Sequence, residues 1–168
     1  IYSHTGWRKV AGRWCYLYNG GAVGAEGLEV ELEGNLSAYT LDAPASSPQA
    51  SADFLKLGAL RVTAPLLCTM YLAPLCEFAH GDRPAFLPAV VGETGSRKTT
   101  ICTLAMSHFG NFGSKQTTAS FADTAASIVQ KAFIVKDAPL LVDDYHPTTE
   151  RKSQDKMKTI AQSLARAY

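Results

Sequence analysis

The amino-terminal part of the chain alternates between apolar and polar positions, and this period of two is typical of half-buried β-strands. Four stretches are strand-like: residues 5–10, 13–18, 28–32 and 36–41. Ala11-Gly12, between the first two stretches, fits a hairpin turn. We therefore predict a small β-rich unit over residues 1–43.

Aromatic and basic side chains are interleaved in the first two stretches. The aromatic residues are Trp7, Trp14, Tyr16 and Tyr18, and the basic residues are Arg8, Lys9 and Arg13. Such a mixture fits a base-stacking platform with phosphate contacts. Alternating aromatics are equally what the buried face of a small sheet contains. We favour the buried sheet and keep the nucleic-acid surface as the alternative.

A stretch rich in proline and serine, residues 44–51, has the composition of a linker. Two apolar stretches come after it, over residues 52–60 and 64–79, and we interpret each as a helix packed on the segments C-terminal to it. The expected organisation is therefore the N-terminal unit, this linker, and a larger core over residues 52–168.

The larger core is organised around residues 86–100. The apolar run at 86–91 predicts a strand, the next residues form a turn rich in Gly, Ser and Thr, and the stretch from Thr99 to about Phe109 predicts a helix. Strand, turn and helix in this order are the setting of a phosphate-binding loop, because unpaired amide N–H groups at the start of a helix bind anions.

This segment matches the template G-x-x-x-x-G-K-[ST] at Gly92, Lys98 and Thr99, whereas Arg97 replaces its second glycine. We expect Lys98 to contact the terminal phosphates of ATP and Thr99 to hold Mg²⁺. The predicted nucleotide-binding residues are Gly92, Glu93, Thr94, Gly95, Ser96, Arg97, Lys98, Thr99 and Thr100. The alternative is an ordinary polar turn before a helix.

A second apolar run, residues 138–142, ends in Asp143 and Asp144. A buried strand that ends in acids places carboxylates at the ligand-binding edge of a parallel sheet. We predict that Asp143 holds the metal together with Thr99. Asp144 joins Lys98 as a predicted catalytic residue, because it would orient or deprotonate the attacking water. The alternative is that the two acids only begin a turn.

The remaining stretches complete an α/β pattern. We expect a short strand near residues 117–121 and a helix over 123–133. Asp123 or Thr124 could touch nucleotide or substrate, but N-capping of this helix explains both residues as well, and we favour the cap. Residues 149–168 have a helical period. Basic residues of this helix, which suit a DNA-binding face or, more commonly, a solvated one, are Arg151, Lys152, Lys156, Lys158 and Arg166.

The composition is that of a globular chain of 168 residues, with 46% hydrophobic residues and a net charge of +1. Nothing in this charge requires a nucleic-acid partner. The four cysteines have no C-x-x-C spacing, which favours reduced thiols in a cytoplasmic protein. We find no signal peptide and no apolar run long enough for a bilayer, so no membrane partner is expected. The chain starts at Ile1 and ends inside a helical pattern, and we interpret it as a fragment.

An ordered set of motifs covers nearly the whole chain. The motifs are Thr-Gly-Trp-Arg (5–8), Trp-Cys-Tyr-Leu (14–17), Gly-Gly-Ala-Val-Gly (20–24), Gly-Glu-Thr-Gly-Ser-Arg-Lys-Thr-Thr (92–100), His-Phe-Gly (108–110), Ser-Phe-Ala-Asp-Thr-Ala (120–125) and Leu-Val-Asp-Asp-Tyr-His-Pro (141–147). In this order they resemble the domain of unknown function nine-two-seven, a P-loop ATPase domain of primase/helicase-like proteins of phages and integrative mobile elements.

The resemblance implies an α/β P-loop NTPase core, RecA/AAA-like and incomplete at the C-terminus, that hydrolyses ATP with Mg²⁺. It also implies coupling to DNA and a homo-oligomeric ring. The family's loop and acid positions carry over onto Gly92, Gly95, Lys98, Thr99, Asp143 and Asp144. The leading hypothesis is therefore a helicase-type ATPase motor core. The alternatives are a P-loop phosphotransferase and a non-catalytic nucleotide-binding assembly module.

Overall fold

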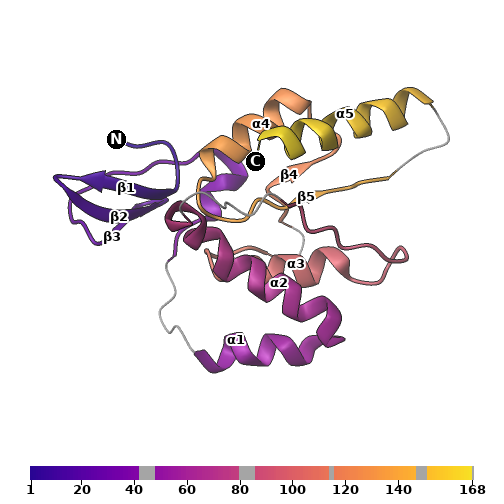
Figure 1. The fold of residues 1–168 in the computed structure, drawn as a ribbon, viewed down its shortest axis with the longest axis horizontal. Coiled ribbons are helices and arrows are strands. Elements are labelled where there is room, and N and C mark those ends of the chain that lie inside the picture. The colour runs from indigo at the N-terminus through magenta and orange to yellow at the C-terminus, as the bar shows by residue number, and fades with distance from the viewer. Residues whose placement is uncertain (42–47, 80–85, 114–115, 147–150, 168) are drawn as a thin grey trace.

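The computed structural model describes residues 1–41, 48–79, 86–113, 116–146 and 151–167. In these ranges the chain forms a mixed α/β fold with a three-stranded antiparallel sheet and a two-stranded parallel sheet (Figure 1). The elements in chain order are β1 (Gly6–Val10), β2 (Arg13–Tyr18), β3 (Gly21–Val23), η1 (Gly34–Ala38), α1 (Pro48–Phe54), η2 (Leu55–Leu57), α2 (Leu60–Leu72), η3 (Ala73–Phe78), α3 (Lys98–Met106), β4 (Ala119–Ser120), α4 (Ala125–Ile134), β5 (Val142–Asp143) and α5 (Arg151–Ala167).

The predicted N-terminal hairpin is confirmed. Strands β1 and β2 are antiparallel, with Trp7 opposite Tyr16, and β3 pairs with the other edge of β2. Ala11 and Gly12 both have positive φ, 49° and 81°, as the tightest hairpin turns require.

The other two expected strands are wrong in whole or in part. Only Val30 of residues 28–32 forms a β-bridge, with Tyr2. Residues 36–41 do not form a strand, because η1 covers Gly34–Ala38. There the Ser37 hydroxyl donates to the Gly34 carbonyl at 2.8 Å, a local bond that competes with extended backbone.

The expected linker at residues 44–51 lies only partly within the described residues, because 44–47 fall outside them. Residues 48–51 are helical, since α1 begins at Pro48, and proline suits the first turn of a helix because it has no N–H to satisfy. Helix α2 begins at Leu60, earlier than expected, and gives way to the tighter η3 at Ala73. Pro74, which cannot donate an α-helical bond, accounts for that change.

The expected strand at residues 86–91 is also wrong, because these residues have no regular secondary structure. Pro88 has no N–H for a ladder, and no backbone hydrogen bond links residues 86–91 to another part of the described chain. The helix after this segment is confirmed as α3, although it ends at Met106 rather than near Phe109.

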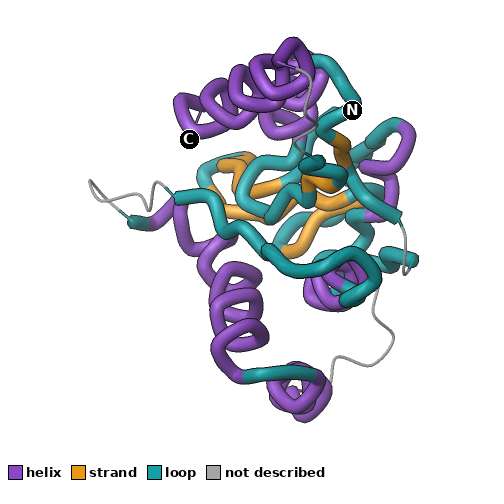
Figure 2. Tube along the Cα trace, turned by 90° about the vertical axis from the view of Figure 1, so that its right-hand side faces the viewer, coloured by secondary structure: helices purple, strands orange, loops and turns teal. Residues whose placement is uncertain are grey.

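The short parallel sheet is sandwiched between helices. Ala119 lies opposite Val142 and Ser120 opposite Asp143, so the two expected strands are confirmed only at these residues. Residues 138–141, expected as part of a buried strand, do not form one. Ile128 of α4 and Ile160 and Leu164 of α5 pack on Ala119, with Val142 at the edge of this cluster. Helices α2 and α3 lie on the other side of the sheet, so helices flank the strands from two sides (Figures 1 and 2). Of the expected last helix, residues 149, 150 and 168 fall outside the described ranges.

The hairpin and the helices share one hydrophobic core. Tyr16 and Tyr39 are buried in the same cluster as Met106, Phe109 and other residues of the α3 region. Hydrogen bonds reinforce this packing: the Trp7 N–H donates to an Asp137 carboxylate oxygen at 2.9 Å, and the Tyr16 hydroxyl donates to the Asp137 carbonyl at 2.8 Å. Burial, and then the charge of Asp137, raises the pKa of Tyr16 above its ordinary value. Among the described helices, none combines the length and apolar character needed to cross a bilayer.

Candidate functional site

The loop that leads into α3 is exposed and closes around the side chain of Lys98. The Lys98 ammonium donates to the carbonyl oxygens of Gly92 at 2.9 Å and Glu93 at 2.8 Å. Ser96 tightens the same turn, because its N–H and its hydroxyl both donate to the Glu93 carbonyl. A positive charge is therefore held at the centre of the loop.

The first turn of α3 adds three amide donors beside this charge. Within the described residues, no carbonyl or side chain accepts from the N–H groups of Lys98, Thr99 and Thr100. The N-cap residue, Arg97, makes no side-chain cap bond, and no acid lies in the first turn. Free N–H groups and the helix dipole together make this turn attractive to an anion.

Arg97 adopts a left-handed backbone conformation, with φ 58° and ψ 31°. This is the position where the phosphate-loop template has glycine, the residue that adopts positive φ without strain. Arg97 thus has a backbone conformation that glycine adopts readily, while its long cationic side chain is exposed.

The structure brings Thr99 and Asp143 together. The Thr99 hydroxyl donates to a carboxylate oxygen of Asp143 at 2.8 Å, across 44 positions of sequence. Thr99 lies in the first turn of α3 and Asp143 is the last residue of β5. Strand β4 fixes the position of Asp143, whose carbonyl accepts from the Phe121 N–H at 2.9 Å.

Cys102 lies one helical turn after Thr99, close enough to Asp143 for the carboxylate charge to change the pKa of its thiol. Burial, and to a lesser extent the negative charge of Asp143, raises the pKa of the Cys102 thiol to about 11. The thiol is therefore protonated near neutral pH, and Cys102 belongs to the main hydrophobic core.

Asp144 makes no hydrogen bond to this pair among the described residues. Its backbone is left-handed, with φ 63°, and its side chain is exposed. The nearest partner of its carboxylate is the Ser120 hydroxyl at 3.5 Å. Among the described residues no hydrogen bond joins Asp144 to residues 92–100, so its catalytic role stays a prediction.

Two residues between β4 and α4 have clear structural roles. Thr124 caps α4, with its hydroxyl accepting from the Ser127 N–H at 3.2 Å, as expected. Asp123 forms an ion pair with Lys131 at 2.8 Å, and the hydrogen bond from Lys131 lowers the pKa of Asp123. Ser120, beside Asp143 in the sheet register, was not predicted as a site residue. Its only signal was its place at the end of a predicted strand.

The oxygen atoms at this position suit a magnesium ion. Two neighbouring ligands of an octahedral Mg²⁺, each about 2.1 Å from the metal, stand about 3 Å apart, and Mg²⁺ takes few protein ligands besides water and phosphate. The Thr99 and Asp143 oxygens are separated by 2.8 Å. The described residues contain no group of three or more His, Cys, Asp or Glu side chains able to hold a metal.

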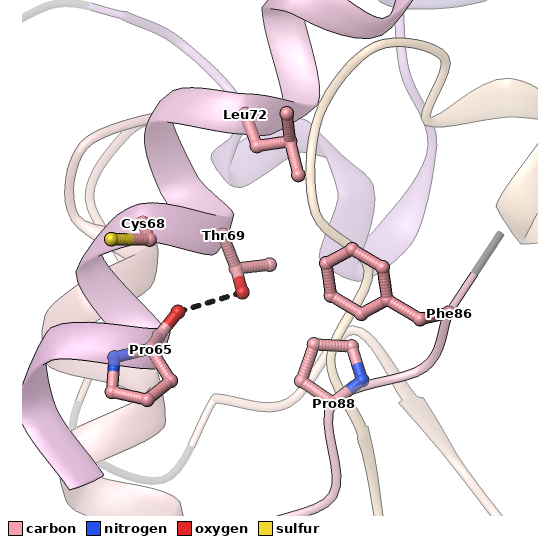
Figure 3. Close-up of a pocket in the computed structure, with 6 residues that line it drawn as sticks. All are labelled: Pro65, Cys68, Thr69, Leu72, Phe86 and Pro88. Carbon is pink, nitrogen blue, oxygen red and sulfur yellow. Dashed lines mark hydrogen bonds between the residues drawn. The ribbon is translucent and has the colours of Figure 1, made fainter. Parts of the chain in front are cut away.

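An apolar pocket of about 400 Å³ lies elsewhere, between α2 and the segment before the loop (Figure 3). Its lining residues are Pro65, Cys68, Thr69, Leu72, Phe86 and Pro88. The one hydroxyl in this lining donates to the Pro65 carbonyl at 2.8 Å, so it is already satisfied. None of the lining residues belongs to the loop or to the acid pair, and the pocket offers little to a phosphate.

Comparisons of the chain with models of known families, with curated proteins and with solved structures gave no match. A functional interpretation of the site therefore depends on its geometry and on the ordered motifs of the sequence.

Proposed function

We propose that this chain is a P-loop NTPase core, RecA/AAA-like, that binds and hydrolyses ATP with Mg²⁺. The observation that carries the proposal is the 2.8 Å contact between Thr99, in the first turn of α3, and Asp143, at the carboxyl end of β5. A hydroxyl that follows a loop lysine and an acid at a strand end are the two protein ligands that P-loop NTPases give to magnesium.

Each residue of the site has a defined task in this proposal. The phosphate oxygens accept hydrogen bonds from the free N–H groups of Lys98, Thr99 and Thr100 and from the Lys98 ammonium. On nucleotide binding, the Lys98 ammonium would leave its two carbonyl acceptors and contact the γ-phosphate. There its positive charge would offset the negative charge of the transition state. Thr99 and Asp143 would hold Mg²⁺, which supplies charge neutralisation when bound.

Asp144 is the proposed partner of the attacking water. Because it is exposed and next to the metal ligand Asp143, a modest turn of its side chain toward the loop would let it accept a proton from that water. Its present contact with Ser120 is the observation that favours the non-catalytic alternative, a module that binds nucleotide without turnover.

The proposal extends to a motor that acts on DNA as a homo-oligomeric ring in the cytoplasm. The family resemblance implies DNA and the ring. The cytoplasmic setting is supported by the cysteines, all four of which are free thiols.

Nucleotide binding tests the site directly. A fluorescent ATP analogue with Mg²⁺ should bind the wild-type chain, and Lys98→Ala should weaken binding by roughly a hundredfold because a charge-assisted phosphate contact is lost. Lys158→Ala removes the same charge from an exposed position on α5 and should leave binding unchanged. Equal affinity of the Lys98→Ala variant and the wild type would contradict the site.

Turnover separates the three hypotheses. Release of free phosphate, abolished by Asp143→Ala and Asp144→Asn, supports the ATPase. A phosphorylated small molecule in place of free phosphate supports a phosphotransferase. Tight binding without either product supports the non-catalytic module.

A further inference from the structure

The segment around η1 hydrogen-bonds to the chain just before both strands of the parallel sheet. The Asn35 side-chain amide donates to the Thr117 carbonyl, two positions before β4, at 3.0 Å. The Tyr39 hydroxyl donates to the Pro139 carbonyl, three positions before β5, at 2.6 Å. One short segment therefore holds the entry to each strand, and we call residues 35–41 the brace.

The brace also contacts the chain at the end of α3. The Leu41 N–H donates to the Phe109 carbonyl at 3.3 Å. At Gly110 the two backbones approach so closely that a Cβ on this residue would overlap the Ala38 carbonyl oxygen. Because α3 carries Thr99, the brace is in contact with all three elements on which the candidate site depends.

Tyr39 is held firmly within the brace. Its side chain is 1% exposed and lies in the main hydrophobic core with Val135 and Ala138, which come from the chain just before β5. Its own carbonyl accepts from the Asn19 N–H at 2.7 Å, at the end of the hairpin. A packed ring and a tied backbone fix the place of the hydroxyl.

N-terminal residues also hold the chain that runs from α4 to β5. The Thr5 hydroxyl donates to the Lys136 carbonyl at 2.9 Å, and the Tyr16 hydroxyl donates to the Asp137 carbonyl at 2.8 Å. Asp137 has a φ of 55°, a conformation that a residue with a Cβ keeps only where its surroundings enforce it. The course of the chain toward β5 is therefore imposed by its contacts.

The sheet itself is too short to set the position of Asp143 alone. Strands β4 and β5 each contain two residues, and a sheet of two strands is marginally stable by itself. A functional site needs its groups held to within about 0.5 Å. Contacts outside the ladder must therefore help to keep the Asp143 carboxylate 2.8 Å from the Thr99 hydroxyl.

We propose that Tyr39 is a positioning residue for Asp143. Through the Pro139 carbonyl it fixes where β5 begins, and so where the Asp143 carboxylate stands relative to Thr99. The inference rests on the proposed function for the role of Asp143 as a metal ligand, whereas the coupling between Tyr39 and β5 requires no nucleotide. The N-terminal residues then belong to the site and do not form a separate module.

Two substitutions of tyrosine by phenylalanine provide a matched pair. Tyr39→Phe removes the hydroxyl next to β5 and keeps the ring in the core. Tyr16→Phe removes the same group from a second buried tyrosine of the same core, whose acceptor at Asp137 is farther from β5. Each variant loses one buried hydrogen bond, so the two should lose similar stability.

Hydrogen exchange of two backbone amides reports the alignment of the strands. The Ala119 N–H donates to the Leu141 carbonyl at 3.0 Å, and the Phe121 N–H donates to the Asp143 carbonyl at 2.9 Å. In Tyr39→Phe both amides should exchange roughly tenfold faster relative to the amides of α2, the effect of one lost hydrogen bond on local opening. In Tyr16→Phe this ratio should stay at the wild-type value.

An exposed member of the brace gives a second variant. Asn35→Ala removes the contact with Thr117 and leaves the core intact, since Asn35 is exposed. It should speed exchange of the same two amides by roughly threefold, less than Tyr39→Phe because its hydrogen bond is open to water. If circular dichroism shows that Tyr39→Phe is unfolded, this variant decides the question.

Magnesium dependence tests the link to the site. A fluorescent ATP analogue should bind the wild type more tightly with Mg²⁺ than with EDTA. Tyr39→Phe should reduce this gain by up to roughly tenfold, the lower end of what outer contacts of a metal ligand contribute. Its affinity in EDTA should not change, because the loop and Lys98 do not depend on β5. Tyr16→Phe should keep the full gain.

Three outcomes would overturn the proposal: equal acceleration at the amides of α2, the same changes in both tyrosine variants, or wild-type exchange in both Tyr39→Phe and Asn35→Ala. Failure of the nucleotide site is a separate result. A wild-type chain that binds no nucleotide would refute the proposed function, while exchange would still test the coupling. A wild-type chain that binds with Mg²⁺, beside a Tyr39→Phe variant equal to it in exchange and in magnesium gain, would refute the role of Tyr39 alone.

Discussion

At the scale of single residues, Arg97 is the clearest conflict between residue type and backbone. Its φ of 58° lies in the region that favours glycine, and a residue with a Cβ is held there at a cost of roughly 1–2 kcal/mol. The sequence already marks this position as unusual, because the phosphate-loop template has glycine where this chain has Arg97.

We expect Arg97→Gly to raise the free energy of unfolding by up to about 1 kcal/mol, because relief of strain exceeds the added entropy of the unfolded chain. Arg97→Ala keeps the Cβ and should give no such gain. Urea unfolding of the three proteins is the measurement. An equal gain for both variants would assign the effect to the lost guanidinium and not to the backbone.

The Cys102 thiol predicts a pH dependence. Its pKa is about 11 in the native state, whereas an unfolded chain loses this proton near pH 8.5. Between these values the native state binds more protons than the unfolded state, so the free energy of unfolding falls as pH rises. The difference in stability between wild type and Cys102→Ala should therefore shrink between about pH 8 and pH 11. A constant difference in urea unfolding across that range would contradict the raised pKa.

At the scale of elements, α5 holds the sheet that positions Asp143. Ile160 is 1% exposed and packs with Ala119 and Ile128, beside Val142. Ile160→Ala should lower the free energy of unfolding by about 2–4 kcal/mol, through lost burial and the cavity left behind. Lys158→Ala, on the exposed side of the same helix, should change it by less than about 0.5 kcal/mol. Chemical unfolding gives both values, and similar small losses would mean that α5 is not docked.

The sequence patterns predicted some elements correctly and others wrongly. Period and cap residues were enough for α3, α4 and the hairpin, because their signals are local. Residues 36–41 were predicted as a strand from alternation, and residues 86–91 from an apolar run. A strand also needs a ladder of backbone hydrogen bonds to a neighbouring strand. Residues 36–41 make only isolated backbone bonds, to Asn19 and Phe109, and no backbone bond links residues 86–91 to another part of the described chain. Apolar character alone did not specify burial either, because Phe86, Leu87 and Val91 are 54%, 47% and 90% exposed.

At the scale of the whole molecule, the hairpin is fixed to the rest of the chain by a close approach at Gly6. A Cβ on Gly6 would lie 2.4 Å from the Lys136 carbonyl oxygen, and φ there is +96°. Gly12 has a similarly positive φ of +81° but nothing within 4 Å. Substitutions at the two positions therefore distinguish two costs. Both would strain the backbone, but only a substitution at Gly6 would also clash with a distant part of the fold.

Gly12→Ala should cost roughly 1–2 kcal/mol of stability from backbone strain alone. Gly6→Ala should cost clearly more, about 3 kcal/mol or above, because the hairpin must also move away from Lys136. Thermal and urea unfolding compare the two variants. Equal losses would show that the hairpin does not pack closely on the segment around Lys136.

The sequence by itself determined the local features: the hairpin turn, the loop before α3, the cap of α4 and the acids at the end of β5. These depend on residues close together in the chain, whose preferences are read from spacing and type. Tertiary structure alone decided that Thr99 meets Asp143 while Asp144 contacts Ser120, and that Trp14 stays exposed while Tyr16 is buried. Contacts between distant segments depend on how the elements pack, and a period or a motif does not specify that packing.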